Sequence, residues 1–154
     1  IGMPPPLRIE KWEEGGLPRG SYLVDMDGIM HIVVRDMAPT LEHFNEIKDL
    51  VDKKFDPPAM GVMFFNTTAG TLTPVVYVKE VNTTYFEGSC GSGTTAVAAA
   101  FSADEPDGSY RFTLPQPAGT ITATVDKVQG EVKAVYIEGT VSLSEVMEVE
   151  VVSP

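Results

Sequence analysis

Cys90 is the only cysteine among the 154 residues, and it begins the glycine-rich segment Cys90–Ala96. The small residues of Ala96–Phe101 follow and predict a helix that packs closely against its neighbours. Backbone N–H groups at a helix start carry the positive end of the helix dipole, so they stabilise a thiolate and bind a carboxylate. This pattern predicts that Cys90 is a nucleophile or a general base beside a carboxylate-binding turn.

Two histidines and two glutamates are further candidates for the site. His31 lies in a strand-like apolar run just after a turn, where an imidazole is either a buried, hydrogen-bonded side chain or a group that acts on the substrate. His43 lies on the polar face of a predicted helix and is interpreted as solvated. Glu80 ends a strand that leads toward Cys90, and Glu87 precedes the cysteine by three residues. Of the two glutamates, we favour Glu80 as the site residue.

Composition and charge exclude several classes of protein. The formal net charge of −11 argues against nucleic acid and anionic membranes as partners. The apolar runs are too short to span a membrane, and the first residues do not resemble a signal peptide. A single cysteine excludes an internal disulfide framework, so we expect a reducing, cytoplasmic location.

The sequence offers no pattern for a metal or a nucleotide cofactor. One cysteine and two distant histidines do not have the spacing of metal ligands. The glycine-rich turn lacks the Lys of a P-loop and the third glycine of a dinucleotide-binding fingerprint. We therefore expect no cofactor and no metal site.

Turn signals divide the chain into short elements. Residues 1–20 are rich in proline and glycine and predict an extended arm or linker, and residues 21–154 predict one domain. A surface helix is predicted at Thr40–Phe55 from its apolar spacing, and a central buried helix at Ala96–Phe101. Strands are predicted at both halves of Ser21–Val34, divided at Asp27-Gly28, and at Gly61–Asn66, Thr71–Val81, Tyr110–Leu114, Thr120–Val125, Val132–Glu138 and Val141–Val151. The fold class is α+β, with about eight mostly antiparallel strands wrapped around the central helix.

The segment Ser89–Thr94, followed by an alanine-rich helix, resembles the diaminopimelate epimerase and proline racemase superfamily. The strand–Pro–Gly–strand segment Phe112–Ile121, the closing segment Val135–Val141 and the Gly28–His31 turn resemble further parts of that family in the same order. The resemblance covers nearly the whole chain, but only one half of the family's usual length.

The resemblance implies an isomerase that inverts the α-carbon of an amino acid without pyridoxal phosphate. Such enzymes use two cysteines, one from each of two similar domains, as base and acid on opposite faces of the carbon. It implies that Cys90 is the acid/base of the C-terminal domain, and that His31 and Glu80 match the family's site histidine and strand-end glutamate. The substrate carboxylate would then be bound by the turn residues Gly91, Ser92, Gly93 and Thr94.

Some residues depart from the family pattern. Val81 follows Glu80 where the family has arginine, and Ile29 and Met30 replace an asparagine and a proline. Gly61 or Met63 stands where the epimerase has another asparagine. These changes disfavour meso-diaminopimelate and favour an amino acid with a less charged side chain.

The second cysteine and the second domain are absent from these residues. We therefore expect the chain to be inactive without an N-terminal partner domain, or without a second chain that supplies one. Two alternatives remain on the same fold: an isomerase acting on a compound that is not an amino acid, and a carboxylate-binding domain without turnover. An unrelated cysteine hydrolase is disfavoured, because neither histidine has an evident orienting partner.

Overall fold

The structure is a computed structural model that describes residues 1–139. Along the chain the elements are β1 (Gly2–Met3), β2 (Arg8–Lys11), the 3₁₀ helix η1 (Glu14–Gly16), β3 (Tyr22–Met26), β4 (Ile29–Arg35), α1 (Leu41–Lys54), β5 (Ala59–Asn66), β6 (Thr71–Val78), β7 (Thr83–Phe86), α2 (Gly91–Phe101), β8 (Gly108–Gln116), β9 (Gly119–Val128) and β10 (Glu131–Gly139). The strand predicted at Val141–Val151 lies outside the described residues.

The strands form two sheets. One has four strands in the order β1-β10-β9-β8, and the other has six in the order β2-β3-β4-β5-β6-β7. Neighbours are antiparallel except β4 and β5, which are parallel because α1 carries the chain back between them. The predicted α+β class is therefore confirmed. Residues 1–139 hold ten strands rather than about eight, because β1, β2 and β7 add to the predicted set.

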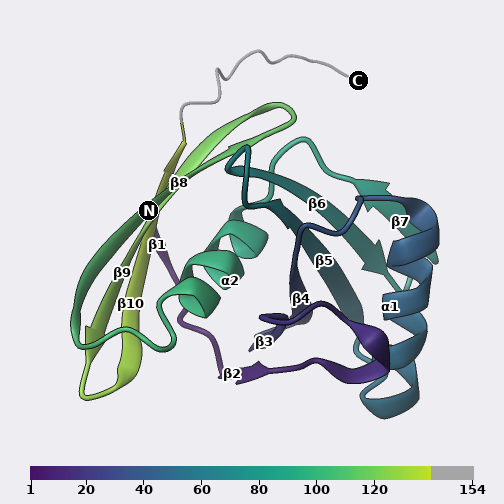
Figure 1. Ribbon diagram of the computed structural model, residues 1–154, viewed down its shortest axis with the longest axis horizontal. Helices are drawn as coiled ribbons and strands as arrows, with labels where there is room; N and C mark the ends of the chain where they lie inside the picture. Colours follow the sequence, from purple (N-terminus) through teal and green to yellow (C-terminus); the bar gives the residue numbers. More distant parts are fainter. Residues whose placement is uncertain (140–154) are drawn as a thin grey trace.

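Residues 1–20, which we expected to form an arm, contribute strands to both sheets. Gly2 of β1 lies opposite Tyr136 of β10, while Ile9 of β2 lies opposite Val24 of β3. The purple segment of Figure 1 accordingly runs from the four-stranded sheet to the six-stranded sheet. The segment also fills part of the core, since Trp12 is only 3% exposed.

The two helices cover opposite faces of the six-stranded sheet (Figure 1). On one face, Phe44, Ile47 and Val51 of α1 pack against alternate residues of β4 and β5, as the helical spacing of these residues predicts. On the other face, α2 lies between the two sheets and contacts both. The layers are therefore α1, six-stranded sheet, α2 and four-stranded sheet.

The composition of α2 explains its central place. Ala96–Ala100 are all buried, and the small alanine side chains let two sheets approach the same helix. Val97 contacts the core on the six-stranded side, whereas Ala98 contacts the core on the four-stranded side. The predicted central helix is confirmed, and it begins at Gly91, directly after Cys90.

Candidate active site

Cys90 is the N-cap residue of α2. Its backbone is extended, with φ −140° and ψ 113°, and its sulfur accepts a hydrogen bond from the N–H of Gly93 at 3.3 Å. Cys90 is partly exposed as a residue. An N-cap oxygen normally fills this position, and a negatively charged sulfur gains more than a neutral one from an N–H group at the positive end of a helix.

The helix start leaves two backbone donors open beside the thiol. The N–H of Gly93 is taken by the Cys90 sulfur, and the N–H of Thr94 donates to the Cys90 carbonyl at 2.9 Å. Within residues 1–139, no acceptor is found for the N–H groups of Gly91 and Ser92. These two donors can bind one carboxylate next to the sulfur.

Close packing explains why small residues are needed here. A Cβ atom at Gly93 would collide with the sulfur of Met63 and would lie 3.2 Å from the Cys90 sulfur. A Cβ atom at Gly91 would lie 3.2 Å from a methyl carbon of Ile137. The glycines therefore let the start of α2 sit directly on β5 and β10.

The structure brings His31 to the site through Ser92. The Nε2 atom of His31 lies 3.0 Å from Oγ of Ser92, and the same Oγ lies 3.6 Å from the Cys90 sulfur. His31 is fully buried on β4, and burial lowers its pKa to about 4. The imidazole is therefore neutral at neutral pH.

The hydrogen-bond pattern indicates which ring nitrogen carries the proton. Nδ1 of His31 is buried and has no partner within the described residues, whereas Nε2 faces Ser92. Placing the proton on Nε2 satisfies the donor and leaves only an acceptor unpaired, which is the less costly arrangement. Nε2–H then donates to Ser92, which leaves the Ser92 hydroxyl proton able to point to the Cys90 sulfur.

Gln116 is a site residue that the sequence analysis missed. Its side-chain carbonyl accepts the Cys90 N–H at 2.9 Å, and its amide nitrogen donates to the Thr94 hydroxyl at 2.7 Å. Gln116 ends β8, 26 residues beyond Cys90, in the segment Phe112–Ile121 that resembles the family, but that resemblance gave Gln116 no role. Only the pairing of the four-stranded sheet places them together.

Neither glutamate shares a side-chain hydrogen bond with the thiol within residues 1–139. Glu80 is exposed in the turn between β6 and β7, and within residues 1–139 it shares no hydrogen bond with Cys90, Ser92 or His31. Its role in the site stays a prediction. Glu87 is half-buried, and its backbone N–H donates to the carbonyl of Pro74 at 2.9 Å.

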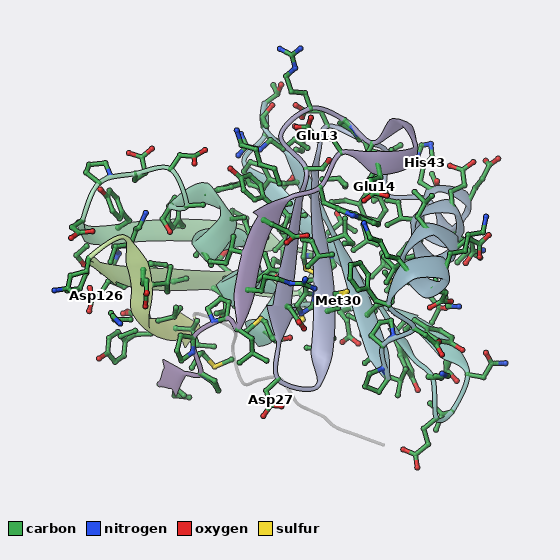
Figure 2. All side chains as sticks on the ribbon, turned by 90° about the horizontal axis from the view of Figure 1, so that it is seen from below. Glu13, Glu14, Asp27, Met30, His43 and Asp126 are labelled. Carbon is green, nitrogen blue, oxygen red and sulfur yellow. The ribbon has the colours of Figure 1, made fainter. Side chains whose placement is uncertain are left out.

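His43 has a structural role at the start of α1. Its Nδ1 lies 2.8 Å from the carbonyl of Ala38, and its backbone N–H donates to the hydroxyl of the N-cap residue Thr40. Figure 2 shows it on α1 at the surface of the molecule. The surface interpretation of His43 is therefore confirmed.

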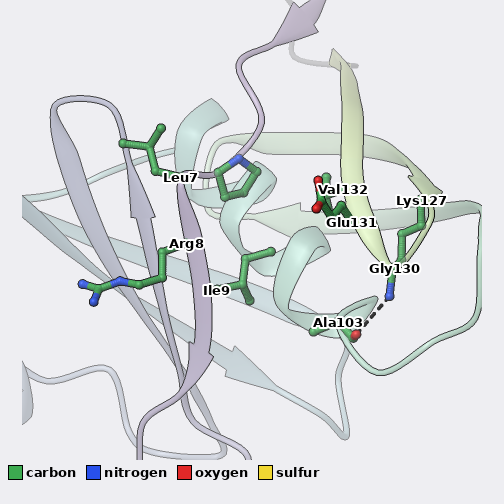
Figure 3. A pocket seen from close by; sticks show the side chains of 9 residues that line it. Leu7, Arg8, Ile9, Ala103, Lys127, Gly130, Glu131 and Val132 are labelled. Carbon is green, nitrogen blue, oxygen red and sulfur yellow. Dashed lines mark hydrogen bonds between the residues drawn. The ribbon is translucent and has the colours of Figure 1, made fainter.

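A cavity of about 410 Å³ lies near the opposite end of α2, where Arg8, Ile9 and Lys127 line it (Figure 3). The Lys127 ammonium is not free to bind a ligand there. It donates to the carbonyls of Ser102, Ala103 and Glu105 at 2.8, 2.9 and 2.6 Å. Lys127 therefore caps the C-terminal end of α2 by binding backbone carbonyls there, at a position where the helix dipole favours a cation.

Residues 1–139 contain neither a metal-binding cluster of side chains nor a membrane-spanning helix. No group of three or more His, Cys, Asp or Glu side chains in residues 1–139 is arranged to hold a metal ion. No helix in this part of the chain is long and apolar enough to cross a membrane.

Known proteins resemble this chain over nearly its whole length. A family model described as "Histidine racemase CntK N-terminal domain" matches residues 1–147. The chain belongs to this family. A protein of Fusobacterium nucleatum subsp. nucleatum named histidine racemase is 31% identical over 146 residues, which is 93% of this chain and 52% of that protein. A histidine racemase of Staphylococcus aureus is 34% identical over 65 residues, covering 42% of this chain and 24% of the relative.

The family match confirms one prediction and corrects another. The expectation of a racemase family is confirmed. The assignment to the C-terminal half is wrong, because the matching model is described as the N-terminal domain. The chain spans about half the length of the Fusobacterium relative, at 52%.

Proposed function

We propose that this domain is one half of a cofactor-independent amino-acid racemase, with histidine as its substrate and Cys90 as one acid/base group. The observation that carries the proposal is the pairing of the N-cap thiol of the partly exposed residue Cys90 with two open backbone donors, from Gly91 and Ser92. The relatives' name, histidine racemase, supports the choice of substrate.

The proposed reaction begins with the substrate carboxylate bound to the N–H groups of Gly91 and Ser92. The Cys90 thiolate takes the α-proton, and the electrons of the broken C–H bond move onto the α-carbon and the carboxylate. The two N–H donors and the helix dipole stabilise the charge that develops there. A second acid returns a proton to the opposite face, so the product has the inverted configuration and the substrate gains and loses one proton.

Ser92 and His31 support the same step. The Ser92 hydroxyl, turned toward sulfur by His31, stabilises the thiolate before proton abstraction. Gly93 donates to the same sulfur, and the Thr94 hydroxyl is occupied by the Cys90 carbonyl. Of the four residues predicted to bind the carboxylate, we therefore propose that Gly91 and Ser92 do so.

The second acid must come from outside these residues, because Cys90 is the only cysteine. We propose that a partner domain, or a second chain, presents a thiol to the face of the substrate opposite Cys90. This chain covers only 52% of the Fusobacterium relative, so the rest of that relative is long enough to form such a domain.

The test is racemisation of L-histidine in D₂O. Loss of the α-proton signal is followed by ¹H NMR, and D-histidine is measured by chiral chromatography. The full-length protein that carries this chain should exchange the proton and form D-histidine. Cys90→Ala should reduce both by about 10²- to 10⁴-fold, the usual contribution of a general base. The 154-residue chain alone should form no D-histidine.

Two outcomes would contradict the proposal. Turnover that survives Cys90→Ala would remove the thiol from the mechanism. Binding of histidine without exchange, by the full-length protein, would indicate a carboxylate-binding domain instead. Exchange with another amino acid and none with histidine would keep the racemase but change the substrate.

A further inference from the structure

Gln116, Thr94 and the backbone of Cys90 form a closed ring of hydrogen bonds. The Cys90 N–H donates to Oε1 of Gln116 at 2.9 Å, and Nε2 of Gln116 donates to Oγ1 of Thr94 at 2.7 Å. The Thr94 hydroxyl then donates to the Cys90 carbonyl at 2.7 Å. The reversed amide would set its NH₂ group against the Cys90 N–H, so only one orientation of Gln116 fits.

This ring decides which donors at the start of α2 remain open. Gln116 takes the N–H of Cys90, the Cys90 sulfur takes that of Gly93, and the Cys90 carbonyl takes that of Thr94. Without Gln116, the Cys90 N–H would be a third open donor, and its peptide group would be free to rotate toward an anion. Because the N–H and the side chain share one Cα atom, a shift of the Cys90 backbone on losing this bond would also move the sulfur.

Gln116 itself is held firmly by the four-stranded sheet. It ends β8 opposite Gly119, the first residue of β9, so it belongs to the last pair of a hairpin. The same hairpin touches the segment before Cys90, where the Ala118 N–H donates to the Gly88 carbonyl at 2.8 Å. A Cβ atom at Gly88 would lie 2.7 Å from that of Ala118. The β8–β9 hairpin therefore contacts the cysteine segment at two adjacent points.

We propose that Gln116 is the positioning residue for Cys90. Its amide fixes the Cys90 peptide so that the sulfur stays on the Gly93 N–H, and so that only Gly91 and Ser92 face the ligand. Gln116 acts through Cys90 and does not touch the substrate. The part of this proposal that concerns catalysis rests on the proposed racemase function, whereas the part that concerns thiol reactivity does not.

The experiment compares Gln116→Met, which keeps the side-chain length and loses both hydrogen bonds, with the wild-type protein. Iodoacetamide should alkylate Cys90 about fivefold more slowly at pH 7 in the variant, the rate equivalent of about 1 kcal/mol of lost thiolate stabilisation. In the full-length protein, kcat for racemisation should fall about tenfold while KM changes less than about twofold, because the carboxylate donors remain. Thr113→Val is the matched control: it lies on β8, as Gln116 does, removes only a hydroxyl pair with Thr122 of β9, and should change neither rate.

Two further variants keep the test decisive. Gln116→Leu, which also loses both hydrogen bonds and adds no charge, should fold and slow alkylation to the same extent as Gln116→Met. Gln116→Met combined with Thr94→Val should be little slower than Gln116→Met alone, because one ring is broken in both.

The results also separate this proposal from the proposed function. An alkylation rate and a kcat within about twofold of wild type in both Gln116 variants would overturn the positioning role. The same conclusion would follow if the lost rate were no larger than the fraction of the variant that is unfolded. Slower alkylation in a protein that racemises nothing would support the positioning role and reject the racemase.

Discussion

The ring of His31 occupies the space that a side chain at Gly61 would fill. The two residues lie side by side on the parallel strands β4 and β5, and a Cβ atom at Gly61 would be 2.5 Å from Nδ1 of His31. The histidine is fully buried, so its ring has little freedom to move away. Gly61 therefore allows His31 to reach Ser92.

Gly61→Ala should disturb the site and the core together. The new methyl group would force the imidazole away from Ser92 and destabilise the fold by about 1–3 kcal/mol, as overpacking of a core does. Chemical denaturation would measure the stability, and iodoacetamide the reactivity of Cys90. Gly2→Ala is the control, because its methyl group would meet only the Tyr136 ring at 3.8 Å. Equal stability of the two variants would show that the ring can relocate freely.

Ser92→Ala should lower the reactivity of Cys90 without removing the thiol. The variant loses the hydroxyl that lies 3.6 Å from the sulfur and 3.0 Å from His31, so the thiolate loses one donor. We expect alkylation at pH 7 to slow about fivefold, the rate equivalent of about 1 kcal/mol for one ordinary hydrogen bond. Ser109→Ala, at an exposed position on β8, serves as the control. Unchanged alkylation in Ser92→Ala would mean that the hydroxyl proton does not point to sulfur.

His31 should make the fold sensitive to mild acid. Burial lowers the pKa of His31 from 6.5 to about 4, so the unfolded chain binds a proton at a higher pH than the folded chain does. The free energy of unfolding should therefore fall as the pH decreases from about 6.5 to about 4, by about 2 kcal/mol at pH 5. Urea denaturation at pH 7 and pH 5 measures the loss. In His31→Gln, the loss in the free energy of unfolding between pH 7 and pH 5 should be smaller by about 2 kcal/mol. An unchanged loss would mean that other groups cause the pH dependence.

Lys127→Met should destabilise the domain while leaving the thiol intact. The side chain is only 5% exposed, and its ammonium group serves three carbonyls after the end of α2. Leaving these acceptors unpaired should cost about 2–4 kcal/mol in chemical denaturation. Lys133→Met removes only an exposed pair with Glu131 and should change stability by less than about 0.5 kcal/mol. Similar losses in both variants would contradict the role of Lys127.

Local patterns predicted the elements that carry their own signals. The apolar spacing of α1, the alanines of α2 and the turn at Asp27 between β3 and β4 each depend on residues within one short segment. The position of Cys90 at the start of α2 follows from the same kind of signal. Asp27 lies at the tip of that hairpin in Figure 2.

Contacts between distant segments had no such signal. Trp12 lies in a proline- and glycine-rich stretch, yet its burial depends on α1 and the six-stranded sheet. Gln116 and Lys127 are polar residues in strands, and the packing of β8 and β9 against α2 brings them to the two ends of that helix. Tertiary packing decides such positions, and composition does not reveal it.

The pairing of β1 with β10 has a consequence for the order of folding. Gly2 and Met3 pair with Tyr136 and Val135, so β1 is synthesised more than 100 residues before the strand that it needs as its partner. Contacts between such distant positions form late, because the loop they close is long and the two-residue strand repays little of that entropy. We expect β1 to stay unpaired during synthesis until β10 has emerged from the ribosome, and native hydrogen exchange to show this strand opening well before the rest of the domain.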